Sequence, residues 1–145
     1  MTTSDSRLRS VHQTAYRVLY GDTDSGGVVY YANYLRYFEA GRTELLRHYG
    51  TSYRALEDQG FILPVVECKC RYKASAFYDD LLVIETTLVE VKKISCRFDY
   101  RILRESDQKL LVKGYTIHAV VNREGRLSRF PDDYLKILNL ICDEK

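Results

Sequence analysis

The sequence contains no run of 18 apolar residues, and its first ten residues, MTTSDSRLRS, lack a hydrophobic segment. These absences argue against a membrane-spanning helix and a secretory signal, so we expect a cytoplasmic protein without membrane insertion. Charge of one sign is not in excess either, because 22 basic and 20 acidic residues are interspersed and give a net charge of +2. This balance does not predict a nucleic-acid-binding protein.

Cysteine and proline are both scarce. The four cysteines form no CxxC pair, and the C-x-C of ECKCRY places two sulfurs on one face of an expected strand. This spacing does not make a zinc site without distant partners, so we expect reduced structural cysteines and no metal. The two prolines fall near expected element boundaries, and no internal repeat or low-complexity tract is present. A length of 145 residues, 46% of them hydrophobic, suits one domain over residues 1–145.

The first half of the chain predicts a strand, a loop and one long helix. Residues 12–20 contain β-forming Tyr and Val and end before a Gly/Asp/Ser-rich loop at 22–27. Residues 33–49 predict the helix, with Gly50 as its C-terminal cap. The apolar residues that recur at helical spacing there are Leu35, Phe38, Leu45, Leu46 and Tyr49.

The second half predicts mainly strands. After a short helical or irregular piece at 52–59, four β-rich segments are separated by turn residues, at 61–74, 80–91, 95–105 and 109–122. A last amphipathic helix follows Pro131 at 132–141. This order predicts an α+β structure, in which the long helix packs on an antiparallel sheet.

The segment YGDTDSGGVVYYANYLRYFEAGR, residues 20–42, places two carboxylates and two adjacent glycines directly before the long helix. A carboxylate can act as nucleophile or base beside a thioester carbonyl, and free N–H groups at a helix start can polarise its oxygen. Gly26 and Gly27 allow a sharp turn and leave room for a ligand near the main chain. In this arrangement Asp24 projects from the loop towards the carbonyl carbon.

The same segment, extended to YGDTDSGGVVYYANYLRYFEAGRTELL, resembles the signature of the hotdog-fold acyl-CoA thioesterases, specifically the 4-hydroxybenzoyl-CoA and Tol-Pal-associated thioesterase group. The resemblance continues through YDDLLVIET, VKKIS and FPDDY, and so spans nearly the whole chain. It implies a hotdog fold, an antiparallel sheet wrapped around one long central helix. It further implies hydrolysis of an acyl-CoA to a free acid and CoA, without a cofactor, by a homotetramer built as a dimer of dimers.

The resemblance also assigns residues. Asp24 matches the family's catalytic aspartate, which acts as nucleophile through a mixed anhydride or as general base on water, and both routes stay open. The backbone N–H around Tyr31 matches the oxyanion donor. Tyr20 matches a tyrosine near the aspartate in one branch of the family. That branch often has histidine where this chain has Tyr31, whereas the 4-hydroxybenzoyl branch has tyrosine there.

Two further carboxylates have simpler interpretations. Asp22 is interpreted as a turn or helix-cap residue, because aspartate commonly accepts hydrogen bonds from nearby backbone N–H groups. Glu39 lies about two helical turns after Tyr31 and could reach the acyl pocket as an alternative carboxylate. We favour an ion pair of Glu39 with Arg36 or Arg42.

Lys92, Lys93 and Ser95 occupy a predicted turn between two strands. By resemblance, this is the family's basic segment, which receives the coenzyme A phosphates, often from a neighbouring subunit. Arg126 and Arg129 are secondary candidates for the same role. A solvated turn explains these charges about as well, because exposed turns are routinely charged.

Two other functions are compatible with a hotdog fold. A hotdog dehydratase uses a histidine with a carboxylate, and the absence of histidine between Gly21 and Arg47 argues against it. The second is a non-catalytic module that binds an acyl thioester or a protein, which fold similarity alone does not distinguish from an enzyme.

Overall fold

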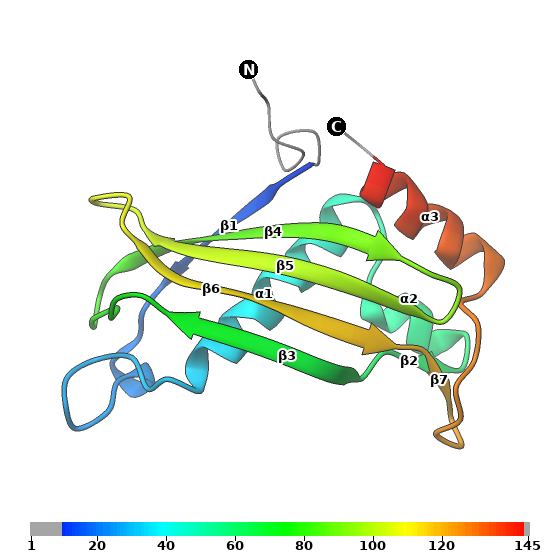
Figure 1. Cartoon of the computed structure of the whole chain (residues 1–145), viewed down its shortest axis with the longest axis horizontal. Coiled ribbons are helices and arrows are strands. Elements are labelled where there is room, and N and C mark those ends of the chain that lie inside the picture. The colour runs from blue at the N-terminus through cyan, green and yellow to red at the C-terminus, as the bar shows by residue number, and fades with distance from the viewer. Residues whose placement is uncertain (1–9, 144–145) are drawn as a thin grey trace.

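The computed structural model describes residues 10–143, and its centre is a five-stranded antiparallel sheet with one long helix against it (Figure 1). The sheet has the order β1-β4-β5-β6-β3. Its strands are β1 (His12–Arg17), β3 (Val65–Tyr72), β4 (Leu81–Val91), β5 (Ser95–Arg104) and β6 (Leu110–Ala119). Residues 1–9, which make up most of the segment behind the expectation about a secretory signal, lie outside the described residues.

The central strands present one face to the core and the other to solvent. Side chains along β4 alternate between half-buried and buried positions from Leu81 to Val89, as expected when successive residues point to opposite faces. β5 shows the same alternation over its first six residues. The inner face therefore carries the buried residues Leu82, Ile84, Leu88, Phe98 and Tyr100.

The long helix α1 (Asn33–His48) packs against this inner face and was predicted within one residue. Phe38 stacks on Tyr100 with a ring-centroid distance of 4.2 Å. Gly50 has φ +81°, and the Thr51 N–H bonds to the Leu46 carbonyl as in a Schellman cap, which confirms the predicted helix stop. The expected apolar stripe was partly wrong, because Leu35 is exposed.

Residues that the periodicity did not single out complete the buried side of α1. They are Tyr34, Tyr37 and Gly41. A Cβ on Gly41 would overlap the Thr86 hydroxyl and approach the Ile84 side chain to 2.7 Å. Gly41 thus allows the helix to lie directly on β4.

Three smaller structural units lie beside the main sheet. α2 (Tyr53–Asp58) has Ser52 as its N-cap, since the Ser52 hydroxyl accepts the Ala55 N–H at 3.0 Å. β2 (Phe61–Ile62) and β7 (Val121–Asn122) form a separate two-stranded sheet. α3 (Asp132–Asp143) lies beside β4 of the main sheet (Figure 1). Between residues 10 and 143 no helix combines the length and apolarity needed to cross a membrane.

Several predicted boundaries need correction. The first strand stops at Arg17, and Tyr20–Asp22 forms a 3₁₀ turn, so neither Tyr20 nor Asp22 lies in the element expected for it. The segments 61–74 and 109–122 each contain two strands instead of one. Cys68, Cys70 and Cys96 are free thiols, as expected, and burial raises the pKa of Cys96 to about 12.

Candidate active site

The loop between the 3₁₀ turn and α1 is a small hairpin. Thr23 and Val29 form an antiparallel bridge, and the Asp24 N–H donates to the Val28 carbonyl at 2.8 Å. Val28 also bridges to Phe77, which ties the loop to the segment before β4. Gly27 has φ +85°, a left-handed conformation that favours glycine, so the expected sharp turn is present.

Asp24 lies at the exposed tip of this hairpin. Its Oδ1 atom accepts the Gly26 N–H at 2.8 Å and the Val28 N–H at 3.5 Å. A Cβ on Gly26 would come within 3.2 Å of that oxygen, so glycine there leaves space around the carboxylate. The backbone thus orients the Asp24 carboxylate while the residue stays open to solvent.

The start of α1 offers backbone donors. Its N-cap, Ala32, has no side-chain acceptor for the free N–H groups of the first turn. The Asn33 and Tyr34 N–H groups bond to the Tyr30 and Tyr31 carbonyls. Within residues 10–143, however, nothing accepts the N–H of Tyr31 or of Ala32. The expected oxyanion donor at Tyr31 is therefore an available N–H group.

Asp22, the other acid of the D-x-D pair, is buried, with 3% of its surface exposed. Its Oδ2 atom accepts hydrogen bonds from the hydroxyls of Tyr16 and Tyr37, each at 3.1 Å, and from the Leu19 N–H at 3.0 Å. Arg36 lies 3.4 Å from its Oδ1 atom. Asp22 is thus a structural residue, as interpreted, but it joins β1, the 3₁₀ turn and α1 instead of capping a single turn.

The environment of Asp22 favours its charged form. Burial raises the pKa of this carboxyl, but the hydrogen bonds from Leu19, Tyr37 and Tyr16, together with the Arg36 charge, outweigh burial and lower the pKa overall. The backbone carbonyl of Asp22 accepts the Tyr30 N–H at 2.9 Å and the Asn33 amide at 2.8 Å. These bonds hold the two ends of the hairpin loop together beside the helix start.

Two other residues occupy unexpected surroundings. Glu39 is exposed on α1, and the expected ion pair was wrong, because Arg36 bonds to Asp22 and Arg42 donates to the Tyr100 hydroxyl at 3.4 Å. Tyr20 is 77% exposed and packs edge-on against Tyr78, with a ring-centroid distance of 5.6 Å.

An exposed aromatic surface beside the loop was not found from the sequence. The Tyr72 hydroxyl, from the edge strand β3, donates to the Tyr31 carbonyl at 3.0 Å, and the Tyr30 and Tyr31 rings lie 4.7 Å apart. Phe77 and Tyr78 are also about half exposed. Aromatic residues in strands are usually read as core, so only the tertiary arrangement reveals this surface.

The expected basic residues lie on neighbouring turns of the backbone. The Lys92 N–H donates to the Ser95 carbonyl at 2.8 Å in the β4–β5 turn, and the Phe130 N–H donates to the Lys93 carbonyl at 3.0 Å. The second bond brings Arg129 to this turn, and Arg126 lies in the neighbouring hairpin after β7. The Lys92 ammonium also lies 3.8 Å from Glu90, so part of its charge is balanced.

This basic turn and the Asp24 loop lie at opposite ends of the sheet (Figure 1). The Val18 N–H bonds to the Asp80 carbonyl, which places the loop beside the start of β4, whereas Lys92 follows the end of β4. The eleven residues of β4 span about 36 Å at roughly 3.3 Å per residue. A single chain therefore does not bring Lys92 and Lys93 next to Asp24.

Comparison with known proteins identifies the family. The model of the thioesterase-like superfamily matches residues 18–138, most of the chain. The acyl-CoA thioesterase YbgC of Haemophilus influenzae is 44% identical over 91 residues, which cover 62% of this chain and 67% of that protein. The chain belongs to the thioesterase-like superfamily.

Solved structures agree. A DHNA-CoA thioesterase from Staphylococcus aureus has a TM-score of 0.86 at 26% identity, with 90% of each chain covered. A variant of 4-hydroxybenzoyl-CoA thioesterase, with an aspartate replaced by asparagine and in complex with 4-hydroxybenzoyl-CoA, has a TM-score of 0.78 at 25% identity, with 88% of this chain and 98% of that chain covered. The predicted hotdog fold and the predicted class, a thioester hydrolase, are confirmed.

Replacing Asp22 with Asn should destabilise the protein by about 1–3 kcal/mol, because the Tyr16 and Tyr37 hydroxyls and the Leu19 N–H lose the charged acceptor that they share. The folded pKa of Asp22 lies below its ordinary value of 3.8, so its stabilising contribution is present above pH 3.8 and is lost as the pH falls towards the folded pKa. Urea unfolding of wild type should show this loss below about pH 4, and the variant a flatter profile.

Asp58→Asn is the matched control, because Asp58 is exposed at the end of α2. It should unfold like wild type at every pH. Equal stability of Asp22→Asn and wild type at pH 7 would contradict the structural role of Asp22.

Proposed function

We propose that this enzyme hydrolyses acyl-CoA thioesters in a reaction that depends on Asp24. The observation that carries the proposal is the exposed Asp24 carboxylate on a hairpin whose base bonds to Tyr30 and Asn33 at the start of α1. The N–H groups of Tyr31 and Ala32, in the same segment, have no acceptor within residues 10–143. The names of the relatives support the substrate class, and the asparagine variant solved with 4-hydroxybenzoyl-CoA supports an aspartate as the reacting group.

In the proposed reaction the thioester oxygen faces the Tyr31 N–H. That donor, aided by the partial positive charge of the α1 start, stabilises the negative charge that develops on the oxygen. Asp24 either attacks the carbonyl carbon to give a mixed anhydride that water then hydrolyses, or takes a proton from the attacking water. Both routes release CoA and a carboxylic acid. No cofactor takes part.

We assign the nucleotide end of CoA to Lys92, Lys93 and Ser95, with Arg126 and Arg129 nearby. Since β4 separates these residues from Asp24 of the same chain, the turn would serve the active site of a second copy. The edge strand β3 supports such an assembly. It pairs only with β6 in the described part of the chain, and it exposes Val65 and Val66.

The remaining parts of the proposal concern the chain as a whole. Residues 1–145 form one hotdog domain, and four copies assemble as a dimer of dimers in the cytoplasm. Gly26 and Gly27 leave space for the substrate at the loop, and the Tyr20 ring borders this space. Glu39, without the ion pair that was expected, is the alternative carboxylate.

Replacing Asp24 with Asn should lower turnover by about a hundredfold or more, because the amide neither attacks the thioester nor accepts a proton. Asparagine still offers an oxygen to the Gly26 N–H, so the hairpin should keep its shape. Steady-state release of CoA measures the effect, and Glu39→Gln serves as the matched control with near-normal turnover. A folded Asp24→Asn enzyme with normal turnover would move the assignment to Glu39, and absence of hydrolysis by wild type would favour a binding module.

Changing both Lys92 and Lys93 to Ala should raise KM about tenfold and leave kcat nearly unchanged, because the two charges bind substrate and transition state alike. Added salt should have the same effect on wild type by screening these exposed charges. The control is a substrate with the same acyl group on a pantetheine-like thiol without nucleotide phosphates, on which both proteins should behave alike. Equal impairment on both substrates, or none on either, would leave a solvated turn as the explanation.

Light scattering at micromolar concentration should give about four times the chain mass of 16.9 kDa. A second copy is needed to bring the basic turn to the Asp24 loop and to pair the open edge of β3, and the resemblance to the hotdog thioesterases implies that two such pairs assemble. A monomer would contradict both the assembly and the shared site.

A further inference from the structure

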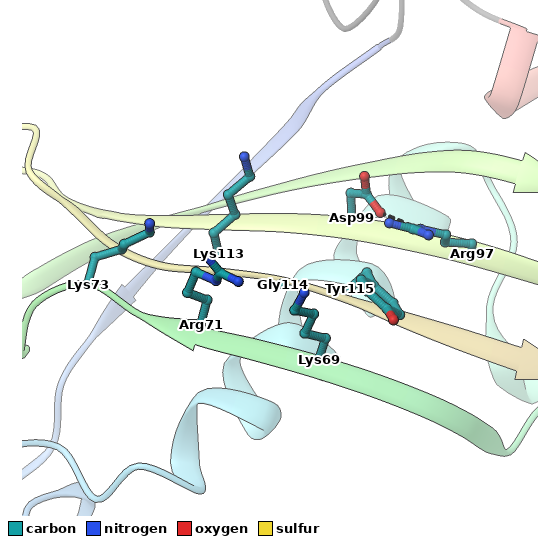
Figure 2. Close-up of a pocket in the computed structure, with 8 residues that line it drawn as sticks. All are labelled: Lys69, Arg71, Lys73, Arg97, Asp99, Lys113, Gly114 and Tyr115. Carbon is teal, nitrogen blue, oxygen red and sulfur yellow. Dashed lines mark hydrogen bonds and ion pairs between the residues drawn. The ribbon is translucent and has the colours of Figure 1, made fainter.

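A basic hollow lies on the outer face of the main sheet, on the side away from α1 (Figure 2). It has a volume of about 290 Å³ and is formed by residues of β3, β5 and β6 together with the segment just after β3. Five cations and one carboxylate line it, namely Lys69, Arg71, Lys73, Arg97, Lys113 and Asp99. We call this surface the outer hollow.

The strand register places like charges together in the outer hollow. Arg71 on β3 is the direct partner of Lys113 on β6. Lys69 lies two residues before Arg71 and so points to the same face, and Lys73 follows Arg71 at the same spacing. Like charges directly opposite each other destabilise an antiparallel strand pair. The fold thus brings two exposed positive charges together, and neither Arg71 nor Lys113 forms an ion pair within the described residues.

Other cations on this face have partners. Arg97 lies 2.9 Å from Asp99, and Arg101 lies 3.0 Å from Glu85. In the described range 10–143, by contrast, no carboxylate forms an ion pair with the other four cations of the outer hollow, Lys69, Arg71, Lys73 and Lys113. The excess of positive charge is therefore local.

Protection of the sheet edge explains only part of this excess. Lysine on an edge strand hinders edge-to-edge aggregation, and β3 is an edge strand. Lys113, however, lies on β6 between β5 and β3, where no edge needs protection. The adjoining hollow of about 990 Å³ is lined by residues of β1, β4, β5 and β6, and its two cations, Lys113 and Arg101, are matched by two carboxylates, Asp99 and Glu85. In the smaller hollow, by contrast, one carboxylate, that of Asp99, faces five cations.

We propose that the outer hollow binds a small anion with two or more phosphate groups, held by Lys69, Arg71 and Lys113. A guanidinium can bind one phosphate through two parallel hydrogen bonds, while lysine ammonium groups supply adaptable point charges. The volume is near the lower end of the range for small-molecule sites. A bound anion would also remove the repulsion between Arg71 and Lys113. The site is separate from both Asp24 and the basic turn.

Inorganic pyrophosphate, titrated into the full chain at low ionic strength and followed by calorimetry, tests this site. The double variant Arg71→Gln, Lys113→Gln should bind at least about tenfold more weakly than wild type, because charge-assisted hydrogen bonds are lost. Lys109→Gln with Lys136→Gln removes the same charge outside the hollow, from exposed positions, and should bind like wild type.

Melting without ligand provides a second measurement. The Arg71→Gln, Lys113→Gln variant should melt about 1–2 °C higher than wild type at low salt, because the opposed charges are gone. Pyrophosphate should raise the melting temperature of wild type and not that of this variant. A variant that melts below wild type would show that these side chains support the fold, and would overturn the proposal.

Three binding results and one mass measurement would also overturn it. The first is no binding by wild type at millimolar pyrophosphate. The second is binding that is lost in the Lys92→Ala, Lys93→Ala variant and kept in the Arg71→Gln, Lys113→Gln variant. This result would place the phosphate site at the β4–β5 turn. The third is binding of duplex DNA without binding of pyrophosphate, which would indicate an extended surface for a polyanion. The fourth is an oligomeric mass of the Arg71→Gln, Lys113→Gln variant that differs from that of wild type. This result would show that the outer face of the sheet is a subunit contact.

Discussion

The buried carboxylate of Asp22 joins the segments that surround the proposed active site. It accepts hydrogen bonds from Tyr16 on β1, from the 3₁₀ turn and from Tyr37 on α1, while its own backbone carbonyl holds Tyr30 and Asn33. A buried anion is tolerated only when donors surround it, so these segments have one arrangement relative to one another. Asp24, two residues away, can therefore be both exposed and well oriented.

Local signals in the sequence predicted most of the fold. The helical spacing and Gly50 located α1, and turn residues separated the strands, because these features depend on neighbouring residues. The errors arose at residues whose burial or ion pairing depends on residues far away in the sequence. Leu35 is apolar but exposed, and Glu39 lacks the expected ion pair because Asp22, far away in the sheet-to-helix connection, binds Arg36.

The candidate site could be predicted as a list of residues but not as an arrangement. Spacing alone does not tell which acid of the D-x-D pair is buried, since that depends on Tyr16 and Tyr37 in other elements. The sequence likewise does not tell whether Lys92 lies near the Asp24 loop of its own chain, whereas the length of β4 separates the two within one chain. The basic residues of β3 and β6 were individually unremarkable in the sequence, and only the register placed Arg71 opposite Lys113.

The missing side chain of Gly41 determines how deeply α1 lies on the sheet. A larger residue at position 41 would collide with Thr86 and Ile84 and move the whole of α1 away from the sheet. Packed interiors have few voids in which such a displacement could be absorbed. The Tyr31 N–H lies just before the start of α1 and would move with the helix. The Asp24 hairpin is also attached to the segment before β4 through the bridge between Val28 and Phe77. The distance between the proposed oxyanion donor and the proposed catalytic carboxylate therefore depends in part on the absence of a side chain at Gly41, about two turns after the start of the helix.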